Sequence, residues 1–349
     1  MKTDLKQLSK AELTGFMEHS GQPPYRVNQI IKWIYKKTAA SFDKMTDLSK
    51  DFREELKAIA VISNLSLLQR QVSEDGTQKF LFELKDGETI ESVLMPNSKG
   101  RERFTLCISS QAGCATGCKF CMTGRLGLKR NLKASEIVDQ VITVKRHIET
   151  WVHGPEASIT NIVFMGMGEP LNNFNEVVRS LRNITGLMGF SKRRITVSTA
   201  GIVPGIRKLA YTGPDVNLAV SLNAATDRIR DEIMPVNKKY PLNKLIKACK
   251  EFPLSPNRRI TFEYVMLGGI NDSTADADRL VKLLSGIKSK VNLIPYNPLH
   301  KSIEFNPPLE NKILRFQKTL RKAGLTVIIR KSKGSDISAA CGQLKASYS

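Results

Sequence analysis

The sequence has no long apolar run. Its first residues, Met1-Lys-Thr-Asp-Leu-Lys6, lack the apolar segment of a secretory signal peptide, and no later stretch is long enough to cross a bilayer. We therefore expect a cytoplasmic protein with no membrane partner. Because thiols in that compartment stay reduced, structural disulfides are not expected.

Acidic residues are few relative to basic ones. The 349-residue chain has 33 Asp and Glu against 54 Lys and Arg, which gives a formal net charge of +21. Such an excess favours a polyanionic partner through phosphate contacts and counterion release, and nucleic acid is the first expectation. An anionic membrane is the second, but no basic amphipathic helix with an aromatic face supports it. Four basic clusters are candidates for an RNA-binding face: 192–194, 238–239, 258–259 and 330–333.

Histidine and cysteine are also scarce. The four histidines show no metal-ligand spacing, but three of the six cysteines lie on one short loop, at Cys114, Cys118 and Cys121. Thiolates are soft ligands, and three from a single loop suit an iron–sulfur cluster or zinc. Three ligands would leave one iron of a four-iron cluster open to a small molecule that accepts an electron.

A structural zinc site is the alternative. It would combine Cys107, just upstream, with the three loop cysteines. Zinc knuckles usually present paired Cys-x-x-Cys units from two turns, and the chain has no second pair. A zinc-stabilised RNA-binding protein without catalytic activity therefore stays open as a second interpretation.

Strand and helix patterns alternate from residue 104 onward. Strands are expected at 104–108, 159–165, 194–198, 216–222, 259–266 and 291–294, and apolar residues at helical spacing follow them. Six such units imply parallel strands with helical crossovers. They are too few for an eight-unit barrel, so we expect an α/β fold with an open sheet or a partial (β/α)6 barrel. The chemistry belongs at the C-terminal ends of its strands.

Smaller parts flank this barrel. We expect a helical accessory domain at 1–62, a β-hairpin linker region at 63–103, the barrel at 104–308, and a C-terminal helix, strand and tail at 309–349.

Small and polar residues gather at the predicted strand ends. Glycines in Gly166-Met-Gly168-Glu169 would let the backbone approach a ligand, and the Glu169 carboxylate could accept from an ammonium group. This segment is not a Gly-x-Gly-x-x-Gly dinucleotide motif. The other candidates at strand ends are Ser198, Ser221, Leu222, Asn223 and Asn297.

Two further candidates lie outside the barrel pattern. Cys341 has small neighbours, Ala339, Ala340 and Gly342, so a large substrate could reach its sulfur; burial as an inert small side chain is the alternative. Glu91, on an alternating strand, is a carboxylate that could move protons near a reactive centre.

The chain resembles the radical S-adenosylmethionine superfamily through Cys-x-x-x-Cys-x-x-Cys after a first strand, and within it the RlmN/Cfr family of adenine methyltransferases. Pro170 in the Gly-Glu-Pro motif favours the RlmN branch, whereas Asn223 departs from the Ser-Leu-His of many relatives. The segments that carry the resemblance are Tyr25-Arg26, Met165–Pro170, Ser191–Arg194, Ser198-Thr199, Met234–Tyr240, Phe262–Leu267, Asn271-Asp272, Asn292–Pro295 and Asp336–Leu344.

The resemblance implies the substrates and the partners. The reaction would be methylation of adenine C2 in 23S rRNA, at the peptidyl-transferase centre, and in tRNA, at adenosine 37. Methylation of C8 of the same rRNA adenosine, as in the Cfr branch, is the alternative within the family. The resemblance also implies an electron donor of the flavodoxin type and a monomeric enzyme.

It further implies roles for the candidate residues. Cys114, Cys118 and Cys121 would hold a [4Fe–4S] cluster, and the strand-end residues would surround S-adenosylmethionine, two molecules of which are used per turnover. Cys341 would receive a methyl group from the first. The second would yield a 5′-deoxyadenosyl radical, which removes hydrogen from the S-methyl group so that the carbon adds to adenine. Cys107 would release the product through a disulfide with Cys341, and Glu91 or Cys107 would take the C2 proton.

Chemistry explains this route. The C2 carbon is electron-poor, so direct polar methyl transfer to it is unfavourable. A cofactor-borne radical avoids that barrier, and the protein mainly positions the groups. A base inside folded RNA must be unstacked to reach such a site.

Overall fold

The computed structural model describes residues 2–97, 103–151, 157–299 and 304–345. Ten strands form one sheet in the order β14-β13-β12-β11-β10-β9-β6-β5-β4-β3. Six neighbouring strands are parallel and match the predicted barrel strands to within two residues at either end. They are β6 (Arg103–Cys107), β9 (Ser158–Phe164), β10 (Ile195–Thr199), β11 (Asn217–Ser221), β12 (Ile260–Met266) and β13 (Ser289–Pro295).

The sheet is open at both edges, as expected for a partial barrel. A seventh parallel strand, β14 (Thr326–Ile329), adds to β13 at one edge. At the other edge β3 (Ser66–Val72), β4 (Gln78–Glu83) and β5 (Thr89–Pro96) pair antiparallel, and β5 pairs with β6. The region predicted as a hairpin linker therefore extends the barrel sheet itself. Residues 98–102 of that prediction lie outside the described residues.

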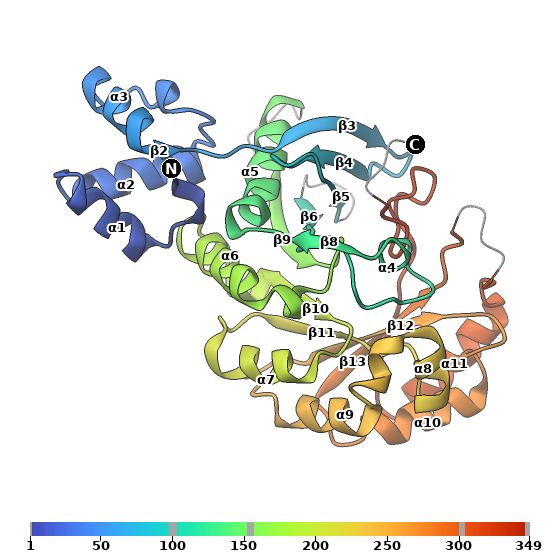
Figure 1. The fold of residues 1–349 in the computed structure, drawn as a ribbon. Coiled ribbons are helices and arrows are strands. Elements are labelled where there is room, and N and C mark those ends of the chain that lie inside the picture. The colour runs from blue at the N-terminus through green and yellow to red at the C-terminus, as the bar shows by residue number, and fades with distance from the viewer. Residues whose placement is uncertain (1, 98–102, 152–156, 300–303, 346–349) are drawn as a thin grey trace.

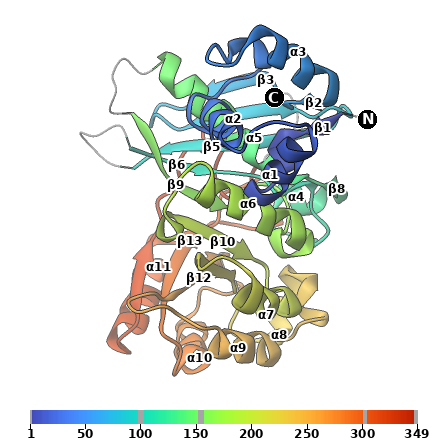
Figure 2. The same ribbon diagram turned by 90° about the vertical axis from the view of Figure 1, so that its left-hand side faces the viewer.

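Helices cover the convex side of the parallel strands (Figures 1 and 2). Each turns an apolar stripe inward, as in α6, where Val177, Leu181 and Ile184 are buried. Local caps fix where several of them begin: Thr226 accepts from the Ile229 amide at the start of α8. The barrel helices are α5 (Ala134–Trp151), α6 (Phe174–Gly186), α7 (Val203–Thr212), α8 (Asp227–Ile233), α9 (Leu242–Glu251), α10 (Thr274–Leu284) and α11 (Glu310–Lys322).

The N-terminal helices stand to one side of α5 and α6 (Figure 1). They are α1 (Lys10–His19), α2 (Tyr25–Ile31), which continues into a π-helical turn at Lys32–Lys36, and α3 (Lys50–Ile59). A buried ion pair between Lys6 and Asp139 attaches them to α5, and the Lys6 ammonium also donates to the Ser63 carbonyl at 2.5 Å. The placement of domain boundaries at 62, 103 and 308 stays a prediction.

Among the described helices, none combines the length and the apolar character needed to cross a bilayer.

Candidate active site

The cysteine loop is held by a small hairpin that the sequence did not reveal. Strand β7 (Gln111–Gly113) pairs with β8 (Leu128–Asn131), and the loop with the short helix α4 (Met122–Arg125) lies between them. The Cys114 amide donates to the Gly127 carbonyl at 2.8 Å. Gly113 has a φ of +77°, and a Cβ there would lie 2.0 Å from that same carbonyl oxygen. Only glycine fits, so the hairpin fixes where the first thiol stands.

The three loop thiols are free and largely enclosed. Cys114 and Cys118 are buried and Cys121 is half-buried. The Thr116 hydroxyl lies 3.0 Å from Cys114 Sγ and 3.6 Å from Cys118 Sγ. Burial raises the pKa of all three thiols, to about 12 for Cys118. Deprotonation therefore needs a strong cationic ligand nearby.

This donor set fits an iron–sulfur cluster. Among the described residues, no three His, Cys, Asp or Glu side chains converge on a point that would hold a single metal ion. A cluster instead takes each thiolate on a separate iron, so its ligands need to face a shared space without meeting. Three soft donors on one enclosed loop satisfy that requirement.

The C-terminal tail packs directly against the cysteine loop. The Met122 amide donates to the Gly342 carbonyl at 2.7 Å, and the Thr123 hydroxyl donates to the Leu344 carbonyl at 2.7 Å. A Cβ on Gly342 would approach the Phe120 carbonyl oxygen to 3.0 Å. Figure 1 shows the tail beside α4, although more than 200 residues separate them in sequence.

Cys341 and Cys107 are brought together by this packing. Cys341 is an exposed residue, yet the protein packed around its sulfur raises the pKa of the thiol, and Glu263 raises that pKa further. Cys107 is buried at the end of β6, and its pKa is raised first by burial and next by the charge of Cys341. The tail also bonds to Glu91 on β5, the strand that pairs with β6, so both thiols lie at the same end of these strands.

Glu91 also meets the tail. Its carboxylate is buried on β5, lies 3.3 Å from the Lys79 ammonium and accepts from the Lys345 amide at 2.8 Å. The tail therefore contacts both the cysteine loop and this carboxylate.

Glu169 and Gly168 follow β9. Gly168 has a φ of +98°, and a Cβ there would lie 2.6 Å from the Gln111 side chain, so glycine lets the two segments touch. The Glu169 carboxylate accepts from the amides of Ala200 at 2.6 Å and Leu171 at 3.0 Å. Burial raises the pKa of Glu169 to about 7.

The remaining strand-end candidates lie along the same edge of the sheet. Ser198 is in β10, Ser221 ends β11, and Leu222 follows it with its amide donating to the Glu263 carbonyl at 2.9 Å. Asn297 follows β13 and donates to the Cys341 carbonyl at 3.3 Å, which ties this edge to the tail.

Asn223 uses its side chain within the protein. It has a φ of +58°, a conformation that asparagine tolerates better than most residues. Its Oδ1 accepts from the Val265 amide at 2.8 Å and its Nδ2 lies 3.1 Å from Met234 Sδ. The amide therefore joins β12 to the loop after β11, and a direct side-chain contact with a ligand stays a prediction.

Sequence reasoning missed Arg230, which is fully buried on α8 behind the ends of β10 and β11. Its segment, Asp227-Arg-Ile-Arg-Asp231, has the charge pattern of an exposed helix, so no signal in one sequence distinguishes it.

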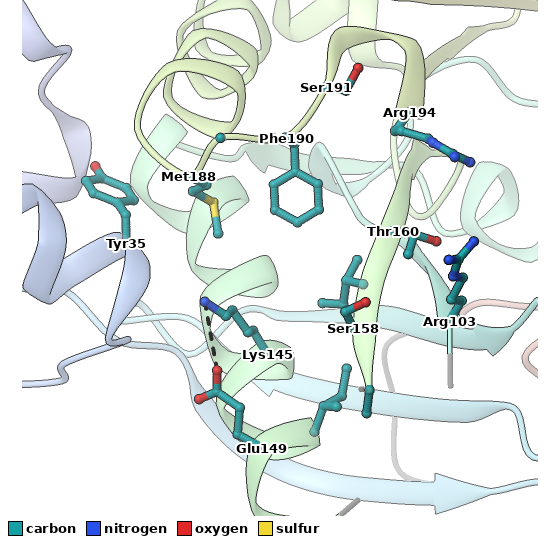
Figure 3. Close-up of a pocket in the computed structure, with 14 residues that line it drawn as sticks. Tyr35, Arg103, Lys145, Glu149, Ser158, Thr160, Met188, Phe190, Ser191 and Arg194 are labelled. Carbon is teal, nitrogen blue, oxygen red and sulfur yellow. Dashed lines mark ion pairs between the residues drawn. The ribbon is translucent and has the colours of Figure 1, made fainter. Parts of the chain in front are cut away.

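A separate pocket of about 530 Å³ lies at the opposite, N-terminal ends of the strands. Figure 3 shows Arg103 and Arg194 pointing toward each other beside Thr160, with the Phe190 ring at the centre. None of the predicted catalytic, cofactor-binding or cluster-ligand residues lines this pocket, but Arg194 of the predicted basic cluster 192–194 does.

Comparison with known proteins identifies the family. A family model described as the ribosomal RNA large subunit methyltransferase N-terminal domain matches residues 3–62, and one for the radical SAM superfamily matches 108–281. Dual-specificity RNA methyltransferases RlmN from Pelobacter propionicus and Geotalea uraniireducens are 51% and 52% identical over 346 residues. These alignments cover 99% of this chain and 96% and 97% of those proteins.

A solved structure agrees over the whole length. The crystal structure of a radical SAM methyltransferase from Sphaerobacter thermophilus superposes with a TM-score of 0.92 at 43% identity. It covers 99% of this chain and 100% of that chain. These relationships set aside the non-catalytic zinc interpretation and imply a [4Fe–4S] cluster and S-adenosylmethionine as cofactors. The chain belongs to the RlmN family of radical SAM RNA methyltransferases.

Proposed function

We propose that the protein methylates C2 of adenine in both 23S rRNA and tRNA through an S-methylcysteine at Cys341. The observation that carries this proposal is the tail itself, whose backbone is hydrogen-bonded to the cysteine loop and to Glu91 on β5, the strand paired with the one that ends at Cys107. The printed name of the relatives, dual-specificity RNA methyltransferase, supports two classes of RNA substrate.

The loop thiols of Cys114, Cys118 and Cys121 would hold the cluster. The seven strand-end candidates at 168, 169, 198, 221–223 and 297 would surround S-adenosylmethionine, with the Glu169 carboxylate facing its ammonium group. When bound, the cluster and S-adenosylmethionine supply a transferable methyl group and the one-electron chemistry that breaks its C–H bond. The protein holds the acceptor thiol and the base in reach of each other.

Cys341 is the methyl carrier in this scheme. Its thiol loses a proton, its sulfur gains the methyl group, and S-adenosylhomocysteine leaves. Access of the sulfur to solvent lets a base enter from outside, while the backbone bonds of Gly342 and Leu344 keep the thiol beside the loop. The adenine must leave its stack to reach this place.

Product release depends on Cys107. The radical adduct would first lose one electron to the cluster. The Cys107 thiol would then give up its proton and its sulfur would bond to Cys341 Sγ while the bond between Cys341 Sγ and the transferred carbon breaks. The electron pair of that bond would stay on the carbon, which would take up a proton to become the methyl group. Glu91 or Cys107 would take the C2 proton. The Glu91 carboxylate lies 3.3 Å from the Lys79 ammonium.

The proposal includes one partner beyond the RNA substrates, an electron donor of the flavodoxin type. The enzyme would act as a monomer.

Nucleoside analysis tests the proposed reaction. Protein reconstituted anaerobically is incubated with S-adenosylmethionine, reductant and either tRNA or 23S rRNA, and the digested RNA is examined by mass spectrometry against 2-methyl- and 8-methyladenosine standards. We expect 2-methyladenosine from both RNAs. 8-Methyladenosine from rRNA alone would instead place the chain in the Cfr branch, against Pro170 in its Gly-Glu-Pro motif. No methylated adenosine from either RNA would refute the proposal.

A further inference from the structure

Arg230 is the largest side chain that the described part of the structure buries completely. It lies on α8, and none of the roles assigned above requires it. A buried guanidinium is costly unless its donors and its charge are compensated, so its surroundings indicate a purpose.

The donors of Arg230 bind at the ends of two barrel strands. Nη2 donates to the carbonyls of Ala200 at 2.6 Å and Ser221 at 3.2 Å, and Nε donates to the Leu222 carbonyl at 2.9 Å. The Ala200 amide also donates to Glu169. A single planar group therefore joins the segments after β10 and β11, where S-adenosylmethionine is proposed to bind. Because the guanidinium is rigid and planar, it fixes the separation of these two segments.

The charge of Arg230 has no direct counter-ion among the described residues. Its remaining bond, from Nη1, goes to the neutral Asn237 Oδ1 at 2.8 Å. Asp227 and Asp231 reach Arg230 only through Asn237, because each carboxylate accepts from Asn237 Nδ2 at 2.8 Å. The Lys119 amide donates to the Ile233 carbonyl at 3.0 Å, so the end of α8 lies against the cysteine loop beside Cys118. Burial lowers the pKa of Arg230 to about 10, and Cys118 is the first of the negative groups that raise it.

The proposed cluster would supply the negative charge that Arg230 lacks among its direct partners. Three thiolates on a four-iron core give a net negative assembly, and reduction adds one more negative charge. A fixed cation facing one of the ligands stabilises the reduced form more than the oxidised form, since the attraction grows with that charge.

We propose that Arg230 is a positioning residue that compensates the charge of the cluster from the Cys118 side and holds the ends of β10 and β11 around S-adenosylmethionine. This inference rests on the proposed cluster ligands. Charge and fork geometry can be separated, because Arg230→Lys keeps the charge and loses the fork, whereas Arg230→Gln loses both.

The test measures two properties of the reconstituted protein other than activity. Redox titration followed by electron paramagnetic resonance gives the midpoint potential, and equilibrium dialysis gives the affinity for S-adenosylmethionine. We expect Arg230→Gln to lower the equilibrium constant for reduction at least tenfold, which is 59 mV for one electron. Arg230→Lys should keep the potential and bind S-adenosylmethionine about tenfold more weakly. Arg279→Gln, which removes an exposed charge on α10, is the control.

The outcomes are distinct. A folded Arg230→Gln protein with the potential of the wild type overturns the inference. If that variant does not fold, Arg230→Lys with unchanged affinity for S-adenosylmethionine overturns it. A wild-type protein without an iron–sulfur signal would show that the proposed cluster ligands are wrong, which is a separate failure.

Discussion

At the scale of single residues, Cys341 combines two properties that seldom occur together. The residue is exposed, yet its own carbonyl accepts from Asn297 and the next carbonyl, of Gly342, accepts from the Met122 amide. An exposed thiol on a free tail would react with many partners, whereas one held at this place meets only what enters between the tail and the cysteine loop. This arrangement supports the proposed role of Cys341 as a carrier that accepts a methyl group and then presents it to RNA.

Replacing the carrier separates cluster assembly from methyl transfer. Cys341→Ala should abolish methylation by at least 10³-fold because no other described thiol occupies its position, on the scale of losing a covalent catalyst. Iron content and the optical spectrum should match the wild type, since Cys341 is not among the proposed ligands. Methylated adenosine above the background of the no-enzyme reaction would contradict the carrier role. Cys249→Ala, on the buried face of α9, is the matched control.

Replacing the second thiol should stop the reaction one step later. Cys107→Ala removes the sulfur that would release the product from Cys341, so RNA should accumulate in covalent linkage to the protein. Denaturing gel electrophoresis with labelled tRNA detects the adduct, and nuclease digestion followed by mass spectrometry should locate it on Cys341. Free methylated RNA formed at the wild-type rate would rule out the disulfide step.

Glu169 gives the site a pH dependence. Burial raises its pKa to about 7, so it is mostly ionised at pH 8 and mostly protonated at pH 6. Because only the ionised carboxylate pairs with an ammonium group, the proposed role predicts that affinity for S-adenosylmethionine is retained above pH 7 and lost below it. We expect the dissociation constant measured by equilibrium dialysis to be about tenfold higher at pH 6 than at pH 8. Glu169→Gln should bind weakly with a flat profile; a flat wild-type profile would contradict the assignment.

At the scale of elements, the β7–β8 hairpin positions the first thiol. Gly113→Ala places a methyl group 2.0 Å from the Gly127 carbonyl oxygen in a left-handed conformation, so we expect a loss of about 2–5 kcal/mol in the free energy of unfolding. Gly127→Ala is a close control, because its φ is also positive at +73° but no atom lies within 4 Å of the added carbon. It should cost about 1–2 kcal/mol.

Urea unfolding of the two apoproteins, together with the iron content after reconstitution, measures the difference. Gly113→Ala should retain little cluster, since the hairpin carries Cys114. Equal stability of the two variants would show that the loop tolerates a shift at Gly113 and does not depend on the hairpin.

The barrel strands were predictable because a strand buried on both faces appears as a continuous apolar run, and a strand buried on one face appears as alternating apolar and polar residues. Either pattern is visible in the sequence. The β7–β8 hairpin was not, because Gln111–Gly113 is short and its pairing with Leu128–Asn131 encloses the cysteine loop. The extension of the sheet by β3, β4 and β5 also depends on pairing between β5 and β6, which no local pattern encodes. Spacing identified the thiols on one loop, whereas only the fold shows that the tail lies against them.

At the scale of the whole molecule, the two ends of the barrel differ. The C-terminal ends of the strands carry the cysteine loop, the tail and Arg230, while the N-terminal ends carry the pocket with Arg103 and Arg194 (Figure 3). Folded RNA spans many tens of ångströms, so contacts with phosphates well away from the reactive base can add affinity without touching the chemistry. The net charge of +21 supports an extended contact of this kind.

The last prediction concerns this distant pocket. Arg103 and Arg194 converge there, and none of the described carboxylates forms an ion pair with either; Arg194 donates only weakly, to Asn161 Oδ1 at 3.4 Å. Two unbalanced guanidinium groups favour a phosphate. The double variant Arg103→Gln, Arg194→Gln should weaken tRNA binding. It should also reduce the slope of log K against the logarithm of salt concentration by about 1–2.

Fluorescence anisotropy with labelled tRNA over a series of salt concentrations measures both quantities. Arg207→Gln is the control, because Arg207 is exposed on α7 and its charge is already balanced by Glu251 at 3.5 Å. Its slope should stay that of the wild type. A short anticodon stem-loop, which can fill the reaction site but cannot extend to the other end of the barrel, should bind the double variant and the wild type equally. If the double variant weakens the stem-loop as much as the full tRNA, the two arginines act on the charge of the whole molecule and not at a distant phosphate.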